Sequence, residues 1–187
     1  DGWRIRRKGA AMRITVTLQW YEMLQGAHVG MMRKIECIKQ GKKDAHGAHY
    51  ERDWSIDIEG AIAEVAAAKA LGMFWPGGIN TWKKPDLGSN IQVRYSQSED
   101  DPHMVIRPDD NDDEIYVLVS PGDAQNEYIV HGWMRGYEAK AHEEWVSHAY
   151  GRPKCWRVPA HMMKSFDVLK LDCLPQLAKK DQAIPAV

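Results

Sequence analysis

Hydrophobic residues between positions 17 and 41 recur at steps of three and four, which is the spacing of one face of an α-helix. The spacing predicts a helix with Thr17 as its N-cap and Gly41 at its end. We expect its hydrophobic face to pack against the core. The alternative is a contact surface for a partner or for a second copy in a homodimer, with methionines as adaptable contacts. The face is formed by Trp20, Leu24, Ala27, Met31, Ile35 and Ile38, and the methionines are Met23, Met31 and Met32.

A second helix is predicted over residues 58–71, where alanine is frequent and Gly72 follows. Because alanine side chains are small, we expect this helix to lie close beneath a sheet. The polar stretch before it, residues 42–53, is predicted to be a loop.

Beyond Gly72 the pattern changes to two-residue alternation and short apolar runs between turns, which indicates β-strands. Helices followed by a run of strands are typical of an α/β or α+β domain. We expect a single domain over residues 12–187, with an N-terminal helical region at 12–50 and a core at 51–187. Residues 1–11 are interpreted as a tag or upstream segment outside this domain, and the alternative is a basic arm that contacts nucleic acid. The predicted strands are 91–96, 104–107, 115–119 and 128–134, with a short helix at 138–148 and an extended segment at 153–158.

The charge of the chain is unevenly distributed. The 187 residues include 25 Lys and Arg against 26 Asp and Glu, for a net charge of -1. Residues 99–114 hold eight acids and one arginine, a local charge of -7, which leaves +6 on the rest. We expect this acidic segment to be a solvated hairpin turn held away from the basic remainder. Its Asp109, Asn111 and Asp113 have calcium-loop spacing, but Glu114 and Ser120 occupy positions that such a loop reserves for Gly and Glu.

Composition limits the compartments in which the chain can work. No apolar run approaches the roughly 18 residues of a membrane span, so we expect no membrane partner. The three cysteines are scattered and odd in number, which favours a reducing compartment over a disulfide framework. We therefore predict a cytoplasmic location, or the host cytoplasm if the chain is phage-encoded.

One set of residues carries a pattern suited to metal chemistry. Asp86 follows Pro85 in a turn-rich segment, and Gln92 and Arg94 alternate with apolar residues in the strand that comes next. Alternate side chains of a strand share a face, so Gln92 and Arg94 should point together. Glu64, in the alanine-rich helix, is placed to approach from the side. Oxygen ligands of this kind suit a hard divalent cation, and a cationic side chain nearby stabilises the charge of a phosphoryl transition state.

At these residues, over about 58–134, the chain resembles the PD-(D/E)XK nuclease superfamily and its small phage or prophage proteins. The resemblance implies a restriction-endonuclease-like mixed sheet flanked by helices, preceded here by a long N-terminal helix. It also implies a hydrolase that cleaves phosphodiester bonds in DNA, or RNA, with Mg²⁺ or Mn²⁺. Asp86, Gln92 and Glu64 would then hold the metal. Arg94 would take the place of the Lys of the motif and complete the catalytic set.

Two departures from that pattern matter. Gln92 offers a neutral amide oxygen where the family has a carboxylate, and Arg94 stays protonated, so it can grip phosphate but not act as a base. A catalytically inactive nucleic-acid-binding or protein-interaction module on the same fold is therefore the alternative. Each residue also has a simpler interpretation. Glu64 could be a solvent-facing helix residue, Asp86 a turn residue, and Gln92 and Arg94 the solvent-exposed face of an amphipathic strand.

Further residues are candidates for neighbouring roles. Asp57 and Glu59 compete with Glu64 for the role of the helix acid, although charge at a helix N-terminus explains them as well. Cations beside the motif and in a loop containing Trp156 are candidates for contact with a nucleic-acid backbone. The nucleic-acid-binding candidates are Lys83, Lys84, Arg152, Lys154 and Arg157.

Overall fold

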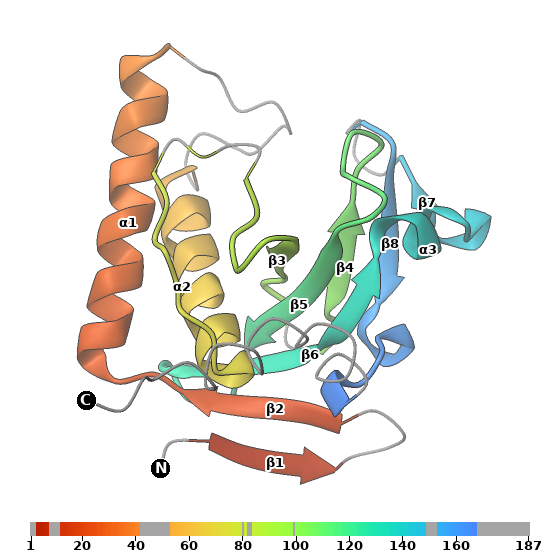
Figure 1. The fold of residues 1–187 in the computed structure, drawn as a ribbon, viewed down its shortest axis with the longest axis horizontal. Coiled ribbons are helices and arrows are strands. Elements are labelled where there is room, and N and C mark those ends of the chain that lie inside the picture. The colour runs from red at the N-terminus through yellow and green to blue at the C-terminus, as the bar shows by residue number, and fades with distance from the viewer. Residues whose placement is uncertain are drawn as a thin grey trace, which may run out of the picture.

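The fold is a mixed α+β arrangement in which one long helix and a small sheet cover opposite faces of a larger sheet, and a second long helix packs on the first (Figure 1). A computed structural model describes residues 3–7, 12–41, 53–79, 81, 84–98, 100–148 and 153–167. Within these residues the helices are α1 (Trp20–Lys39), α2 (Asp53–Leu71) and α3 (Gly136–Lys140), with short 3-10 helices η2 (Glu143–Trp145) and η4 (Ala160–Met162).

The larger sheet has five strands in the order β1-β2-β6-β5-β3. β3 pairs parallel to β5, whereas β5–β6, β2–β6 and β1–β2 are antiparallel. β3 therefore lies at the end of the sheet order. These strands are β1 (Trp3–Arg7), β2 (Met12–Thr17), β3 (Ile91–Tyr95), β5 (Ile115–Pro121) and β6 (Glu127–Arg135).

The smaller sheet has the order β4-β8-β7 and packs with α3 against the face of the larger sheet that α2 leaves uncovered. Because β5 is covered on both faces, its residues 115–120 are all buried, and its sequence is a continuous apolar run. The strands of the smaller sheet are β4 (His103–Ile106), β7 (Val146–Ser147) and β8 (Cys155–Pro159).

The alanine-rich helix behaves as its sequence predicts. Residues 61–68 of α2 are buried, and its alanines pack against Ile91 and Val93 of β3 in one cluster. The helix closes on Gly72, whose φ of 65° is a left-handed conformation that suits glycine. It begins at Asp53, earlier than expected, and residues 42–52 of the predicted loop lie outside the described residues.

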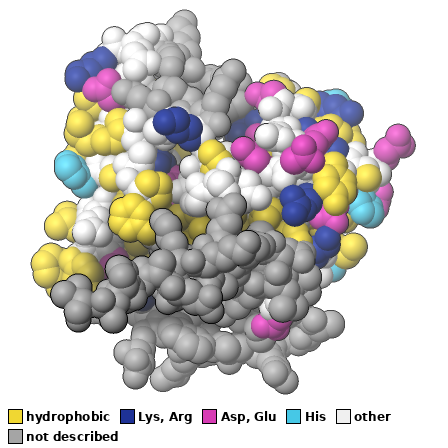
Figure 2. All heavy atoms as spheres, in the orientation of Figure 1, with side chains coloured by type: hydrophobic (Ala, Val, Ile, Leu, Met, Phe, Trp, Pro, Cys, Tyr) yellow, Lys and Arg dark blue, Asp and Glu magenta, His cyan; other side chains and the backbone are white. Residues whose placement is uncertain are grey.

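The prediction that the apolar face of α1 packs on the core is wrong for four of its six residues, whereas Ala27 does pack against the core. Trp20, Leu24, Met31 and Ile38 are exposed, and Figure 2 shows hydrophobic side chains along this flank of the molecule. The helix approaches α2 through Gly26 and Gly30 instead. A Cβ on Gly30 would lie 2.4 Å from the carbonyl oxygen of Asp57, so only glycine allows this approach.

Two expectations about the N-terminal region are also corrected. Residues 3–7 form β1, paired with β2, so part of the segment expected to lie outside the fold joins the sheet; its origin as a tag or upstream segment stays a prediction. Thr17 is not the N-cap of α1, because it is the last residue of β2. Gln19 takes that place, and its backbone N–H donates to Glu22 Oε2 at 2.7 Å.

The strands of the core agree with the alternation seen in the sequence, within a few residues at each end. The segment predicted as a helix over 138–148 divides into α3, η2 and β7. No helix in the described part of the chain has the length and apolar content to cross a membrane.

Candidate functional site

Asp86 lies at the outer edge of β3. Leu87 and Ile91 exchange backbone hydrogen bonds across a tight turn, in which Gly88 has a φ of 58°. This turn folds Asp86 back along the strand, where its Oδ2 accepts a hydrogen bond from the backbone N–H of Val93 at 2.8 Å. Among the described residues, this is the one hydrogen bond of the Asp86 carboxylate, so its other oxygen faces the site without a partner from them.

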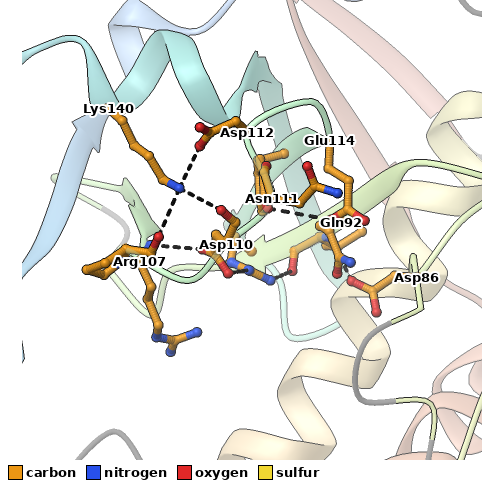
Figure 3. A network of polar contacts seen from close by, with 12 residues as sticks. Asp86, Gln92, Arg107, Asp110, Asn111, Asp112, Glu114 and Lys140 are labelled. Carbon is orange, nitrogen blue, oxygen red and sulfur yellow. Dashed lines mark hydrogen bonds and ion pairs between the residues drawn. The ribbon is translucent and has the colours of Figure 1, made fainter.

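Gln92 and Arg94 share one face of β3, as the alternation predicts, while Ile91 and Val93 are buried against α2 on the other face. The side-chain amide of Gln92 donates from Nε2 to the backbone oxygen of Lys84 at 3.4 Å. This contact turns the amide nitrogen toward the chain that precedes Asp86. Figure 3 shows Gln92 beside Asp86, with the amide oxygen left for another contact.

Arg94 is held by the acidic segment. Its Nη2 donates to Asp110 Oδ1 at 2.8 Å, and its guanidinium carbon lies 5.0 Å from the centre of the Tyr116 ring. Within the described residues, its buried Nε has no hydrogen-bond acceptor. The prediction that the acidic segment stands away from the Gln92–Arg94 face is therefore wrong.

Glu64 is buried, with 6% of its surface exposed, so the interpretation as a solvent-facing helix residue is wrong. Arg33 of α1 donates to both of its oxygens, from Nη1 to Oε1 at 2.5 Å and from Nη2 to Oε2 at 2.9 Å. The indole N–H of Trp75 also donates to Oε2, at 2.9 Å. Glu64 thereby links α1, α2 and the segment after α2, and direct binding of a cation would compete with these donors.

The charges of these groups act on one another. Burial and the nearby negative charge of Glu64 raise the pKa of Asp86 from 3.8 to about 7, although the Val93 N–H, Arg94 and Arg33 oppose the rise. Burial alone would lower the pKa of Arg33, but the hydrogen bond and charge of Glu64 and the charges of Asp86 and Asp57 raise it overall. Glu64 and Asp86, on separate elements, are thus close enough to repel.

The donor set fits a hard divalent cation in part. Asp86 and Gln92 lie beside one another, and each has a side-chain oxygen (Figure 3). Mg²⁺ commonly takes one or two protein oxygens and completes its shell with water and phosphate. Among the described residues, no group of three or more His, Cys, Asp and Glu side chains is arranged to hold a metal ion. The protein ligands offered here are therefore one carboxylate and one amide, with Glu64 contributing negative charge.

Residues 108–113 of the acidic segment are mostly exposed, as predicted, but the segment joins strands of different sheets rather than forming a hairpin, and it is tied to the protein by several contacts (Figure 3). The ammonium group of Lys140, on α3, donates to the backbone oxygens of Pro108 at 3.2 Å and Asp110 at 2.6 Å, and to Asp112 Oδ1 at 2.6 Å. Asp110 Oδ2 accepts from the backbone N–H of Arg107 at 2.8 Å. Nothing in the sequence singled out Asp110 or Lys140, because their partners are distant along the chain.

The candidate nucleic-acid contacts are placed differently. Lys83 and Arg152 lie outside the described residues. Lys84 is exposed next to Gln92, and Lys154 is exposed with its Nζ 4.6 Å from the centre of the Trp156 ring. Arg157 lies in β8 rather than in a loop, with Nη2 3.1 Å from His103 Nδ1.

A separate hollow of about 290 Å³ lies beyond the other end of β3. Glu59 lines it, and Gln97 donates to Glu59 Oε2 at 2.8 Å, so this competitor for the role of the helix acid faces away from Asp86. The remaining lining residues are Tyr95, Pro121, Gly122, Asp123, Ala124, Gln125, Glu127 and Tyr128.

Comparisons of the chain with protein-family models, with curated proteins and with solved structures give no match.

Proposed function

We propose that the chain is a nuclease that hydrolyses phosphodiester bonds in DNA with the help of Mg²⁺ or Mn²⁺. The observation that carries the proposal is the meeting of Asp86, Gln92 and Arg94 at the edge of β3, with the buried charge of Glu64 close by. The residues come from different elements, and their order along the chain is that of the PD-(D/E)XK pattern. A restriction-endonuclease-like core is part of the same proposal.

The residues have distinct parts in this reaction. Asp86 and Gln92 would hold the cation through one oxygen each. Glu64, on α2, would add negative charge near Asp86 without binding the cation directly. The bound cation would polarise a phosphoryl oxygen and lower the pKa of a coordinated water. Arg94 would donate to the phosphate and stabilise the additional negative charge of the transition state. Hydrolysis breaks one P–O ester bond, and water supplies the hydroxyl on phosphorus and the proton on the leaving oxygen.

The test is a cleavage assay on double-stranded and single-stranded DNA, with Mn²⁺, with Mg²⁺ and with EDTA. We expect cleavage that depends on the cation and is lost in Asp86→Ala. Asp113→Ala is the matched control, because it removes an exposed carboxylate that is not among the hydrogen-bond partners of Asp86, Gln92 and Arg94, and it should leave cleavage unchanged. Equal cleavage by the wild type and Asp86→Ala, or no cleavage of any substrate, would refute the proposal.

A second candidate function is favoured by one observation. Both oxygens of Glu64 and one edge of Arg94 already have partners within the protein, which suits a module that binds nucleic acid without cleaving it. This candidate predicts DNA binding that weakens steeply with salt, needs no cation and is unaffected by Asp86→Ala. The same panel of variants therefore separates the two functions.

A further inference from the structure

The acidic loop Arg107–Glu114 reaches Arg94 through a single carboxylate. Asp110 Oδ1 accepts from Arg94 Nη2 at 2.8 Å, and this is an ion pair in which the two side chains are 14% and 21% exposed. Asp110 Oδ2 accepts from the backbone N–H of Arg107 at 2.8 Å. Each oxygen of Asp110 thus has a fixed partner, one in the loop and one at the candidate site.

The loop that carries Asp110 is itself fixed to the body of the protein. Lys140 binds it at three acceptors, Asn111 accepts at its backbone oxygen from the hydroxyl of Tyr116 at 3.1 Å, and Tyr137 donates its backbone N–H to Asp112 at 2.9 Å. The ring of Tyr116 is also the surface on which the Arg94 guanidinium lies. The carboxylate of Asp110 and the ring of Tyr116 together hold that guanidinium in position.

We infer that Asp110 is a positioning residue that orients Arg94 toward a phosphate held at Asp86 and Gln92. This inference rests on the proposed function, since it assigns Arg94 a phosphate group as its ligand. A guanidinium has five N–H donors in one plane, so a carboxylate on one edge leaves other donors to meet a phosphate. A long arginine side chain without this contact would sample many rotamers, and a misplacement of about 1 Å is enough to slow catalysis by up to roughly 100-fold.

The opposite role, in which Asp110 occupies the place of the phosphate and is displaced by it, requires a loop that can move. The contacts of Lys140, Tyr116 and Tyr137 hold the loop from three sides, which favours positioning over displacement. The two roles predict changes of opposite sign when Asp110 is neutralised, so a kinetic measurement decides between them.

The experiment compares Asp110→Asn with Asp113→Asn on a double-stranded DNA oligonucleotide in Mn²⁺. Both variants remove one negative charge from the same loop, but Asp113 has an exposed side chain and does not contact Arg94. We expect kcat to fall by roughly 10- to 100-fold in Asp110→Asn, with KM unchanged or higher, and to stay within about twofold in Asp113→Asn. In an Arg94→Met background, Asp110→Asn should have no further effect, because the residue acts through Arg94.

Three outcomes would overturn the inference. They are an unchanged kcat in Asp110→Asn, a raised kcat, and an equal loss of kcat in the presence and absence of the Arg94 side chain. Asp110→Glu is measured in parallel in case the asparagine variant does not fold. It keeps the charge but moves the carboxylate, so it should also lower kcat.

Failure of the proposed function is separable from failure of this inference. If the wild type does not cleave DNA, the nuclease proposal fails, and binding of the same oligonucleotide in EDTA then tests Asp110. Loss of the contact that orients Arg94 should make Asp110→Asn bind several-fold more weakly than Asp113→Asn, and Arg94→Met should abolish the difference. Equal affinities, or tighter binding by Asp110→Asn, would overturn the role of Asp110.

Discussion

Replacing Glu64 with glutamine removes one buried negative charge and keeps the shape of the side chain. The amide oxygen can still accept from Trp75, but Arg33 loses the carboxylate that now receives two of its N–H groups at 2.5 and 2.9 Å. The side chains of Glu64 and Arg33 are 7% and 20% exposed. Glu64→Gln therefore isolates the cost of leaving a largely buried guanidinium without its counter-charge.

The size of the effect follows from this geometry. Removal of one partner of a buried ion pair costs about 3–5 kcal/mol. Arg33 keeps a hydrogen bond from Nε to the backbone oxygen of Gly78 at 2.8 Å and some contact with water, so we expect the lower end, about 3 kcal/mol. For a chain of 187 residues this corresponds to a fall in Tm of roughly 6–12 °C.

Urea unfolding followed by tryptophan fluorescence, in EDTA, measures the free energy of unfolding of each variant. Arg33→Met and the double variant complete a double-mutant cycle, in which the pair should show a coupling of roughly 1–3 kcal/mol. The double variant should be more stable than Glu64→Gln, because methionine leaves no uncompensated charge. A loss below about 1 kcal/mol in Glu64→Gln, or a cycle without coupling, would refute the assignment of Glu64 as a structural counter-ion.

Three further predictions concern packing and pH. Gly30→Ala should lower the free energy of unfolding by roughly 1–3 kcal/mol, because its Cβ would lie 2.4 Å from the backbone of α2. A Cβ on Gly60 would meet nothing within 4 Å, so Gly60→Ala should raise the free energy of unfolding by roughly 0.5–1 kcal/mol. The pKa of Asp86 is raised from 3.8 to about 7, so its contribution to stability is present below pH 4 and lost as the pH rises through 7. Asp86→Asn should therefore be more stable than the wild type at pH 8. Burial and the charge of Arg13 lower the pKa of His131 from 6.5 to about 4, so its contribution is lost as the pH falls from 6.5 toward 4, and His131→Gln should flatten that part of the stability profile.

Each of these has a clear contrary result. Equal free energies of unfolding for the two glycine variants would show that α1 and α2 can separate without cost. Stability of Asp86→Asn below that of the wild type at pH 8 would show that the Asp86 carboxylate is not penalised by its surroundings. Thermal unfolding between pH 4 and 7 measures the loss of stability at low pH. If His131→Gln loses as much stability as the wild type over this range, groups other than His131 cause the loss.

Residue spacing predicts part of the geometry of the candidate site. Alternation in β3 places Gln92 and Arg94 on one face, and the turn at Gly88 folds Asp86 back to Val93, both of which are local effects. The partners of these residues are not local. Glu64 meets Arg33 from 31 positions away, and Arg94 meets Asp110 from 16 positions away, so no periodicity within one element could indicate either pair.

For α1, the sequence likewise did not predict which face of the helix packs against its neighbour. Its apolar residues have the spacing of a buried stripe, yet four of them are exposed and the contact with α2 is made through Gly26 and Gly30. The apolar residues recur at steps of three and four, and Gly26 and Gly30 are four residues apart, so the spacing favours neither face. The glycine face brings two helix backbones into contact, and its advantage depends on the shape of α2, which the sequence of α1 does not contain.

The sequence by itself determined the conformational preference of each segment. The alanine run and Gly72 specify α2, and the unbroken apolar run of 115–119 specifies a strand buried on both faces. The tertiary structure decided which surfaces meet: β2 beside β6, glycines rather than large side chains between α1 and α2, and the acidic loop against Arg94. Local preferences arise from sterics and hydrogen bonding within a few residues, whereas burial and ion pairing depend on distances that exist only after the elements have packed.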